Sequence, residues 1–279
     1  MTTSTERLPA PQGGIRQSVS DSLIITGRNL KRIPRIPELA IFAIIQSIMF
    51  VLLFAFVFGG AIPLEGYEGA NAYREYLLPG IFVQTIVFAA ATVAIGMCDD
   101  INKGLIDRFR SLPMSRSAVL IGRTFSEVVY NAGILVVLMI AGLAVGWSVH
   151  TDLLSFLAGV ALLLAFAYAM AWLGVWLGVV VPTVEVAQQV SFTVLFPITF
   201  ISGVFVPIYT MPDWLQPIAY WNPVTTLASS LRNLWGNPNP QIGDNFPTQN
   251  PILVTVIWIV LFIVVFGPLG VRRYRNMSR

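Results

Sequence analysis

Six apolar stretches divide the chain, and each is long enough to cross a lipid bilayer. The hydrocarbon core of a bilayer is about 30 Å thick, so a helix that rises about 1.5 Å per residue needs about 20 apolar residues to cross it. The stretches comprise residues 39–58, 76–97, 125–145, 153–181, 186–206 and 252–269. They predict an all-α integral membrane protein, with six transmembrane helices in one domain over residues 37–272.

The composition supports a membrane protein and argues against a soluble one. Of the 279 residues, 56% are hydrophobic and only 11% are charged. Soluble domains usually carry about 25% charged residues. A soluble core of this size could not hide so much apolar surface, so lipid must cover it. The net charge of +3 gives no support for a nucleic-acid partner.

Lysine and arginine are concentrated in three of the segments that flank the apolar stretches. Six lie before the first stretch, five between the second and third, and four after the sixth, so these segments hold fifteen of the seventeen basic residues. Cytoplasmic loops are enriched in lysine and arginine. Six spans place all three segments on one side, which predicts a multi-pass protein of the cell membrane with both termini in the cytoplasm.

The segments outside the six spans have distinct predicted forms. Residues 1–14 are rich in Thr, Pro and Gly and are expected to be a disordered tail. Residues 15–36 repeat apolar side chains at helical spacing, which predicts an amphipathic helix in the cytoplasmic interface. Residues 207–251 are too interrupted to span and too apolar for a solvated loop, so we expect short re-entrant or interfacial helices on the outer side. Residues 273–279 form a basic cytoplasmic tail.

The chain lacks the residues that most catalytic and metal sites need. Cys98 is the only cysteine and His150 the only histidine, which excludes an intramolecular disulfide, a cysteine cluster and a conventional zinc site. We interpret His150 as a loop residue beside Asp152. The sequence contains two lysines and no G-x-x-x-x-G-K-[ST] phosphate loop. We therefore expect no cofactor in this chain, and any ATP-driven activity requires an ATPase on another chain.

One charged segment, residues 99–123, has two possible roles. It contains three aspartates and five basic residues around an apolar face made by Leu105, Ile106, Phe109 and Leu112. It is either an interfacial helix that caps the second and third spans, or a docking element whose apolar ridge anchors a soluble partner. The residues themselves favour neither.

Polar and aromatic side chains within the spans are candidates for a substrate path. Glu127 lies two positions inside the third stretch, so we expect it near the cytoplasmic interface; a proton-relay role is the alternative. Carboxamide side chains can join helices or face such a path, and the spans contain Gln46, Gln84, Asn131, Gln188 and Gln189. We assign to the path, with packing or lipid contact as the alternative, Phe54, Phe58, Phe88, Gln189, Phe192, Phe196 and Phe200.

Glycine recurs at the spacing that brings two helices close together. Gly142 and Gly146 form one G-x-x-x-G pair, and Gly174 and Gly178 form another. Such pairs permit close helix approach within one subunit or between two subunits, and the sequence leaves both open.

Two motifs resemble those of a known family. An acidic pair at 99–100, followed by KGLIDRFRSLPMSR and a later GR, resembles the segment ahead of the third span in permease subunits of type-2 ABC exporters. The stretch ISGVFVPIYTMPDWLQPIAYWNPVTTLASSLRNLW, at 201–235, resembles the segment that follows the fifth span in the daunorubicin-resistance branch of that family. The likeness covers about residues 20–275.

The resemblance implies partners and roles for these two motifs. Such permeases pair with a second copy of themselves and bind two ATPase subunits, which hold the ATP and magnesium. The first motif would couple to the ATPase through Asp99, Asp100, Lys103, Gly104, Asp107, Arg108, Phe109, Arg110, Leu112 and Pro113. The second motif would form an outer gate of re-entrant helices that includes Pro207, Pro212, Trp214, Asn222, Pro223 and Arg232.

The expected function is therefore that of the membrane subunit of an ATP-driven exporter, not of an enzyme. The resemblance implies a hydrophobic or amphipathic cargo: a drug, a polyketide or a lipid taken from the cytoplasm or the inner leaflet. Two alternatives remain. An ion-coupled carrier would need no ATPase, and a membrane-embedded lipid-modifying enzyme would use the aspartates Asp99, Asp100 and Asp107 to hold metal and phosphate.

Overall fold

A computed structural model describes residues 37–58, 64, 66–67, 70–104, 116–240 and 245–276. The predicted disordered tail and amphipathic helix, the centre of the charged segment and the end of the basic tail lie outside these residues. The described residues contain helices and no strand, apart from one isolated bridge between Leu64 and Tyr67. The predicted all-helical class is confirmed for this part of the chain.

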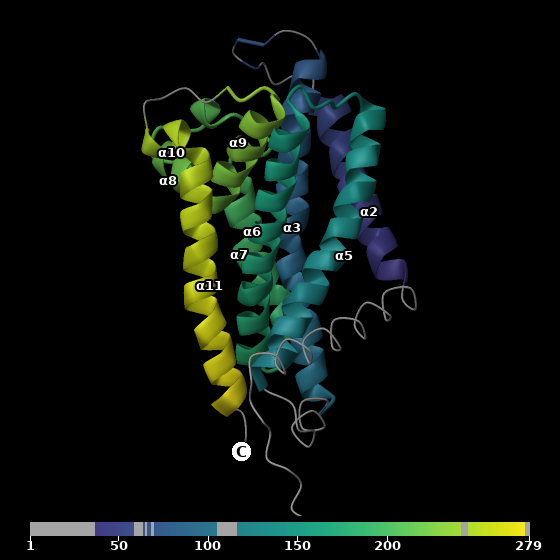
Figure 1. Cartoon of the computed structure of the whole chain (residues 1–279), viewed down its shortest axis with the longest axis vertical. Helices are drawn as coiled ribbons and strands as arrows, with labels where there is room; N and C mark the ends of the chain where they lie inside the picture. The colour runs from purple at the N-terminus through teal and green to yellow at the C-terminus, as the bar shows by residue number, and fades with distance from the viewer. Residues whose placement is uncertain are drawn as a thin grey trace, which may run out of the picture.

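The helices follow one another along the chain and run mostly up and down the bundle (Figure 1). The long ones are α2 (Pro37–Leu52), which continues as the π-helix η2 (Leu53–Phe58), α3 (Ala70–Asn102), α5 (Arg116–Val145), α6 (Leu153–Val180), α7 (Val184–Phe200) and α11 (Pro251–Asn276). The short ones are η3 (Ile208–Thr210), α8 (Gln216–Trp221), α9 (Pro223–Trp235) and α10 (Phe246–Gln249).

Within the described part of the chain, four helices are long and apolar enough to cross a membrane: α3, α5, α6 and α11. Helix α7 is apolar but has 17 residues. It ends at Phe200 and the chain then turns, whereas its apolar stretch continues to residue 206. Pro197 in its last turn, followed by Ser202 and Gly203, disfavours further helix.

Helices α3 and α5 are longer than their apolar stretches, which shortens the charged connection between them. Helix α3 includes Asp99 and Asp100 and ends at Asn102, and α5 already begins at Arg116. Hydropathy detects the part of a helix that is apolar, whereas a helix can continue through charged residues that form pairs one turn apart. The predicted loop of 99–123 is therefore helical at both ends.

Helix α3 forms the centre of the bundle, with α5, α6, α7 and α9 packed around it (Figure 1). Glycine permits the closest of these contacts. A Cβ atom on Gly174 or Gly178 of α6 would lie 2.5 Å from the carbonyl oxygen of Ala90 or Ala94 in α3. This G-x-x-x-G pair therefore serves a contact within the subunit. Gly146 instead has a φ of +103°, a conformation that glycine adopts freely, where α5 ends.

The short helices gather at one end of the bundle, called the capped end here (Figure 1, top). Side chains of the neighbouring loops start the helices: Asp152 caps α6 through the backbone N–H groups of Leu154 and Ser155, and Asn222 caps α9 through that of Val224. Helix α9 packs against α3, α6 and α11 and is largely buried. The opposite end holds the C-terminal part of α11, the end of α3 and the start of α5 (Figure 1).

Candidate functional site

A pocket of about 160 Å³ lies between α2, α3, α5 and α7. Its lining residues recur every three or four positions along α2, α3 and α5, so one face of each of these helices turns toward it, and α7 contributes Phe192. The polar lining residues are Gln46, Ser47, Gln84, Thr85, Thr92, Glu127, Tyr130 and Asn131. Apolar lining residues include Phe50, Phe88, Ile134 and Phe192. The pocket is therefore both polar and aromatic, inside an otherwise apolar bundle.

Several polar groups of the pocket are engaged with helix backbones and with each other. The Thr85 hydroxyl donates to the carbonyl oxygen of Ile81 at 2.9 Å and lies 3.1 Å from the Ser47 hydroxyl, which joins α2 to α3. The Asn131 amide nitrogen donates to the Glu127 carbonyl oxygen at 2.8 Å. The carbonyl end of the Asn131 side chain stays available to the pocket.

Two side chains of the pocket, Gln84 and Glu127, make no hydrogen bond to another described residue. Gln84 is 4% exposed, and both line the cavity. Polar groups in a hydrocarbon environment are costly when they are unpaired. Their orientation toward the cavity therefore makes them candidates for binding water or a ligand.

Glu127 lies further inside its helix than inside its apolar stretch. Helix α5 begins at Arg116, so Glu127 lies about three helical turns from its start. The expectation that Glu127 lies near the cytoplasmic interface stays a prediction, because the structure gives the helix and not the position of the membrane. Hydropathy places the start of the helix too late because charged and polar residues occupy the first turns of α5.

The phenylalanine side chains assigned to a substrate path lie together in the structure. Phe88 and Phe192 line the pocket, Phe88 contacts Phe196 edge to face with centroids 5.1 Å apart, and the ring of Phe196 stacks on Phe200 at 5.8 Å. The contacts continue from Phe200 to Phe205 at 5.2 Å.

A second set of ring contacts leads from Phe205 back to the pocket through residues of η2 and α2. Phe205 stacks on Phe54 with centroids 4.4 Å apart, and Phe54 stacks on Phe50, a residue of the pocket, at 6.1 Å. These seven rings are called the phenylalanine row below: Phe50, Phe54, Phe88, Phe192, Phe196, Phe200 and Phe205. The row joins the pocket to Phe205 near the capped end.

The structure also separates residues that the sequence analysis grouped together. Gln189 is exposed, and its side chain contacts Thr193 of its own helix instead of the pocket. Phe58 is the last residue of η2, and its side chain is not among those described. Phe50 and Phe205 were missed because the contacts that reveal them join segments about 150 residues apart in the chain.

The capped end is held together by a buried arginine. Arg232 is 1% exposed. Its Nε donates to the Tyr76 carbonyl oxygen at 2.9 Å and its Nη2 to the Val204 carbonyl oxygen at 3.2 Å. The hydroxyls of Tyr73 and Tyr76 donate to the carbonyl oxygens of Phe205 and Gly203. Helix α9 and the turn after α7 are thereby tied to the start of α3.

The other residues assigned to an outer gate lie on both sides of this contact. Asn222 donates to the carbonyl oxygens of Ile198 and Ile201, at 2.7 and 2.6 Å, and so joins the start of α9 to the end of α7. Pro223 is the first residue of α9, and Pro207 precedes η3. Pro212 and Trp214 are exposed, and Trp214 is 72% exposed. Asn222, Pro223 and Pro207 belong to the packed cap, and Pro212 and Trp214 form its surface.

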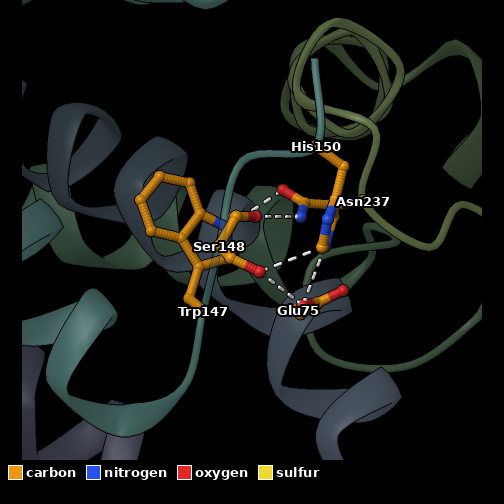
Figure 2. A network of polar contacts seen from close by, with 5 residues as sticks. All are labelled: Glu75, Trp147, Ser148, His150 and Asn237. Atoms are coloured by element: carbon orange, nitrogen blue, oxygen red, sulfur yellow. Dashed lines mark hydrogen bonds and ion pairs between the residues drawn. The ribbon is translucent and has the colours of Figure 1, made fainter.

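A polar network links three segments of the capped end, as Figure 2 shows. The Asn237 side chain accepts from the Trp147 indole N–H at 2.9 Å and donates to the Ser148 carbonyl oxygen at 2.8 Å. The Ser148 hydroxyl donates to Glu75 at 2.9 Å, and the His150 ring lies 3.0 Å from the same carboxylate oxygen. His150 is a loop residue, as expected, but its partner is Glu75 of α3.

At the opposite end, four of the residues assigned to ATPase coupling are described. Asp99 pairs with Lys103 at 2.7 Å along α3, and Gly104 has a φ of +67° where the helix ends. Asp100 forms an ion pair with Arg123 of α5. The other six, Asp107, Arg108, Phe109, Arg110, Leu112 and Pro113, lie outside the described residues.

The described residues offer polar and aromatic side chains for binding and packing. They contain no group of three or more His, Cys, Asp or Glu side chains that could hold a metal ion. Asp99 and Asp100 are each engaged by a basic side chain. The arrangement that stands out is a polar pocket in an apolar bundle, joined by aromatic rings to the capped end.

Comparison with known proteins assigns the chain to a family. Residues 21–235 match the family described as ABC-2 type transporter. The chain is 30% identical, over 94% of its length and 88% of the relative, to "Daunorubicin resistance ABC transporter permease protein DrrB1" of Streptomyces coeruleorubidus. It is 26% identical, over 98% of its length and 94% of the relative, to "Probable doxorubicin resistance ABC transporter permease protein DrrC" of Mycobacterium tuberculosis. The chain therefore belongs to the ABC-2 type transporter family.

Proposed function

We propose that this chain is the membrane-spanning permease subunit of an ATP-driven exporter, and that its cargo is a hydrophobic or amphipathic molecule such as a drug, a polyketide or a lipid. The observation that carries the proposal is the pocket between α2, α3, α5 and α7, together with the phenylalanine row that extends from it to the capped end. Aromatic rings offer a continuous apolar surface to a molecule that leaves the pocket. The names of the two relatives refer to resistance to daunorubicin and to doxorubicin.

The proposed topology has six spans in the cell membrane. Helix α2 with η2 and helix α7 serve as the first and fifth spans, beside the four helices that have full membrane length. The capped end faces outward and both termini lie in the cytoplasm, because most basic residues of the described part of the chain lie where α3 ends, where α5 begins and where α11 ends, away from the cap. The short helices of the cap then act as an outer gate over the phenylalanine row.

Transport requires two copies of an ATPase subunit, which hold ATP and magnesium, and a second copy of this chain. The coupling element is the connection between α3 and α5. The ion pair between Asp100 and Arg123 joins these helices beside the connection. Glu127 in the wall of the pocket lies one helical turn from Arg123. A push on the connection would therefore move the wall of the pocket.

The experiment that tests the proposal is co-purification of the full-length chain with candidate ATPase subunits, followed by measurement of ATP hydrolysis. The test variant combines Arg108→Glu with Leu112→Asp, and the control is Arg273→Glu, an exposed residue of α11. We expect the test variant to lose the ATPase and the control to keep it. Failure of every ATPase to associate with the wild type would contradict the proposal.

The alternative of an ion-coupled carrier has one observation in its favour, the acidic residue Glu127 in the pocket. A proton-coupled carrier would transport cargo in vesicles without any ATPase, driven by an imposed pH gradient. Its transport would stop in the Glu127→Gln variant. The exporter predicts no accumulation under those conditions, with or without the substitution.

A further inference from the structure

We infer that the pocket between α2, α3, α5 and α7 binds the ammonium end of an amphipathic organic cation, and that the Glu127 carboxylate supplies the counter-charge. The apolar body of the molecule lies along the phenylalanine row. This inference rests on the proposed exporter function and specifies the class of its cargo.

The charge of the pocket is the first argument. Glu127 is the only lysine, arginine, aspartate or glutamate among the described residues that line the cavity. The nearest basic residue along α5, Arg123, forms its ion pair with Asp100, and its charge also acts on Glu127 from one helical turn away. A charged side chain within a membrane helix is costly unless it is paired. An organic cation would offset this cost, and an anion would increase it.

The other polar groups of the pocket are the second argument. An ammonium group has three N–H donors and no acceptor, so it needs several acceptors at once. Gln84 is 4% exposed, lines the cavity and has no hydrogen-bond partner among the described residues. The amide nitrogen of Asn131 donates to the Glu127 backbone, which leaves its side-chain carbonyl oxygen to accept. With the Glu127 carboxylate, these carbonyl groups supply acceptors from two helices, α3 and α5.

The aromatic residues of the pocket fit the same ligand. Phe88, Tyr130 and Phe192 line the cavity alongside Glu127. The face of an aromatic ring attracts a cation, and the attraction increases when water is excluded. Neutral amphiphiles would gain the apolar contacts but neither the ion pair nor the cation–π contacts.

The size of the cavity determines which part of the ligand it holds. Drug-sized ligands occupy cavities of about 300–1,000 Å³, whereas this one measures about 160 Å³. It can enclose an amine and its nearest carbon atoms, but not a whole drug. Phe88 and Phe192 belong both to the pocket and to the phenylalanine row. A ligand whose charged end sits beside Glu127 therefore has its apolar part directed along the row.

The test compares two probes that differ in charge and share one aromatic body: 1-pyrenemethylammonium and 1-pyrenemethanol. The full-length chain is placed in phosphatidylcholine nanodiscs, and saturable energy transfer from tryptophan to pyrene reports binding, with empty nanodiscs as the reference. We expect the wild type to bind the ammonium probe about tenfold more tightly than the alcohol, as one charge-assisted contact would give. Glu127→Gln should equalise the two affinities.

Two further variants test whether the preference for the ammonium probe depends on a carboxylate in the pocket. Glu185→Gln removes an exposed carboxylate of α7 outside the pocket and should keep the preference. The double variant Gln84→Glu with Glu127→Gln moves the carboxylate to the α3 wall and should restore the preference, which shows that Glu127→Gln had not simply unfolded the pocket. Equal affinities for the two probes in the wild type, or an unchanged preference in Glu127→Gln, would overturn the inference.

The probe-binding test and the ATPase test of the proposed function can give different results. If an ATPase associates and drives export of neutral and cationic compounds alike, the exporter proposal stands and the cation inference fails. If no ATPase associates but the pocket discriminates between the two probes through Glu127, the inference about the pocket stands and the exporter proposal fails.

Discussion

The guanidinium carbon of Arg232 lies 3.6 Å from the centroid of the Tyr76 ring, in a site where the arginine is 1% exposed. No carboxylate of the described residues forms an ion pair with this arginine. Two backbone carbonyl groups and the ring face satisfy it instead, and these belong to α3 and to the turn after α7. The contact therefore determines where the cap sits on the bundle.

Arg232→Lys should destabilise the cap. An ammonium group lacks the planar set of donors that reaches two carbonyl groups at once, and each hydrogen bond to a charged group contributes about 1.5–3 kcal/mol. We expect a loss of roughly one such bond, measured as a lower midpoint of thermal unfolding in detergent. Arg273→Lys, at an exposed position of α11, is the control and should leave the midpoint unchanged. A wild-type midpoint for Arg232→Lys would show that the cap does not depend on this contact.

Two glycines in different surroundings predict opposite effects of the same substitution. Gly133→Ala should stabilise α5 by up to about 1 kcal/mol, because alanine is the better helix former and nothing lies within 4 Å of the added Cβ. Gly174→Ala should destabilise the bundle by about 1–3 kcal/mol, as overpacked sites do. Its Cβ would lie 2.5 Å from the Ala90 carbonyl oxygen. Thermal unfolding of both variants checks the signs, and equal signs would refute the close contact between α3 and α6.

The two ion pairs at the end of α3 should differ in strength. The side chains of Asp100 and Arg123 are 19% and 16% exposed, whereas those of Asp99 and Lys103 are 32% and 61% exposed. Exposed pairs one turn apart contribute about 0.3–0.5 kcal/mol, and hydrogen bonds to less exposed charged groups about 1.5–3 kcal/mol. Double-mutant cycles with Asn and Gln replacements should therefore give a larger coupling energy for Asp100 with Arg123. Equal coupling energies would mean that this pair does not brace α3 against α5.

The apolar stretches were sufficient to predict a helical membrane protein, because the bilayer imposes a length and a composition on every span. They were insufficient for the start of α5. This helix begins with charged and polar residues, so the hydropathy boundary at residue 125 lies about two and a half turns inside the true start at Arg116. The pocket itself had no sequence signal, since it depends on how four helices pack.

The candidate site was also predicted only in part. Spacing along a helix revealed some of its residues, whereas the tertiary fold brings in the others. Five of the phenylalanines assigned from the sequence lie together in the structure, because aromatic residues one turn apart on α7 share a face. Phe205 could not be found in this way, since it lies in a turn and meets Phe54 through the tertiary fold. Arg232 was singled out by motif, but its partners are backbone carbonyl groups, which no pattern of side chains reveals.

The phenylalanine row predicts a transport defect that is separate from stability. Phe196 is 41% exposed and contacts Phe88 and Phe200, so Phe196→Ala should interrupt the row at little cost to the fold. One aromatic contact contributes about 0.5–1.5 kcal/mol. We expect slower ATP-driven export of a pyrene-labelled amphiphile from proteoliposomes that contain the co-purified ATPase, with its binding to the pocket retained.

The matched control for this prediction is Phe42→Ala. Phe42 is 68% exposed on α2 and does not belong to the row, so its removal deletes an aromatic ring without interrupting the row. Phe196→Leu is the third variant, because it keeps an apolar side chain of similar reach and should recover part of the rate if apolar contact, and not the ring itself, guides the cargo. Equal rates for Phe42→Ala and Phe196→Ala would show that the row is a lipid-facing or packing feature and that the cargo leaves the pocket by another route.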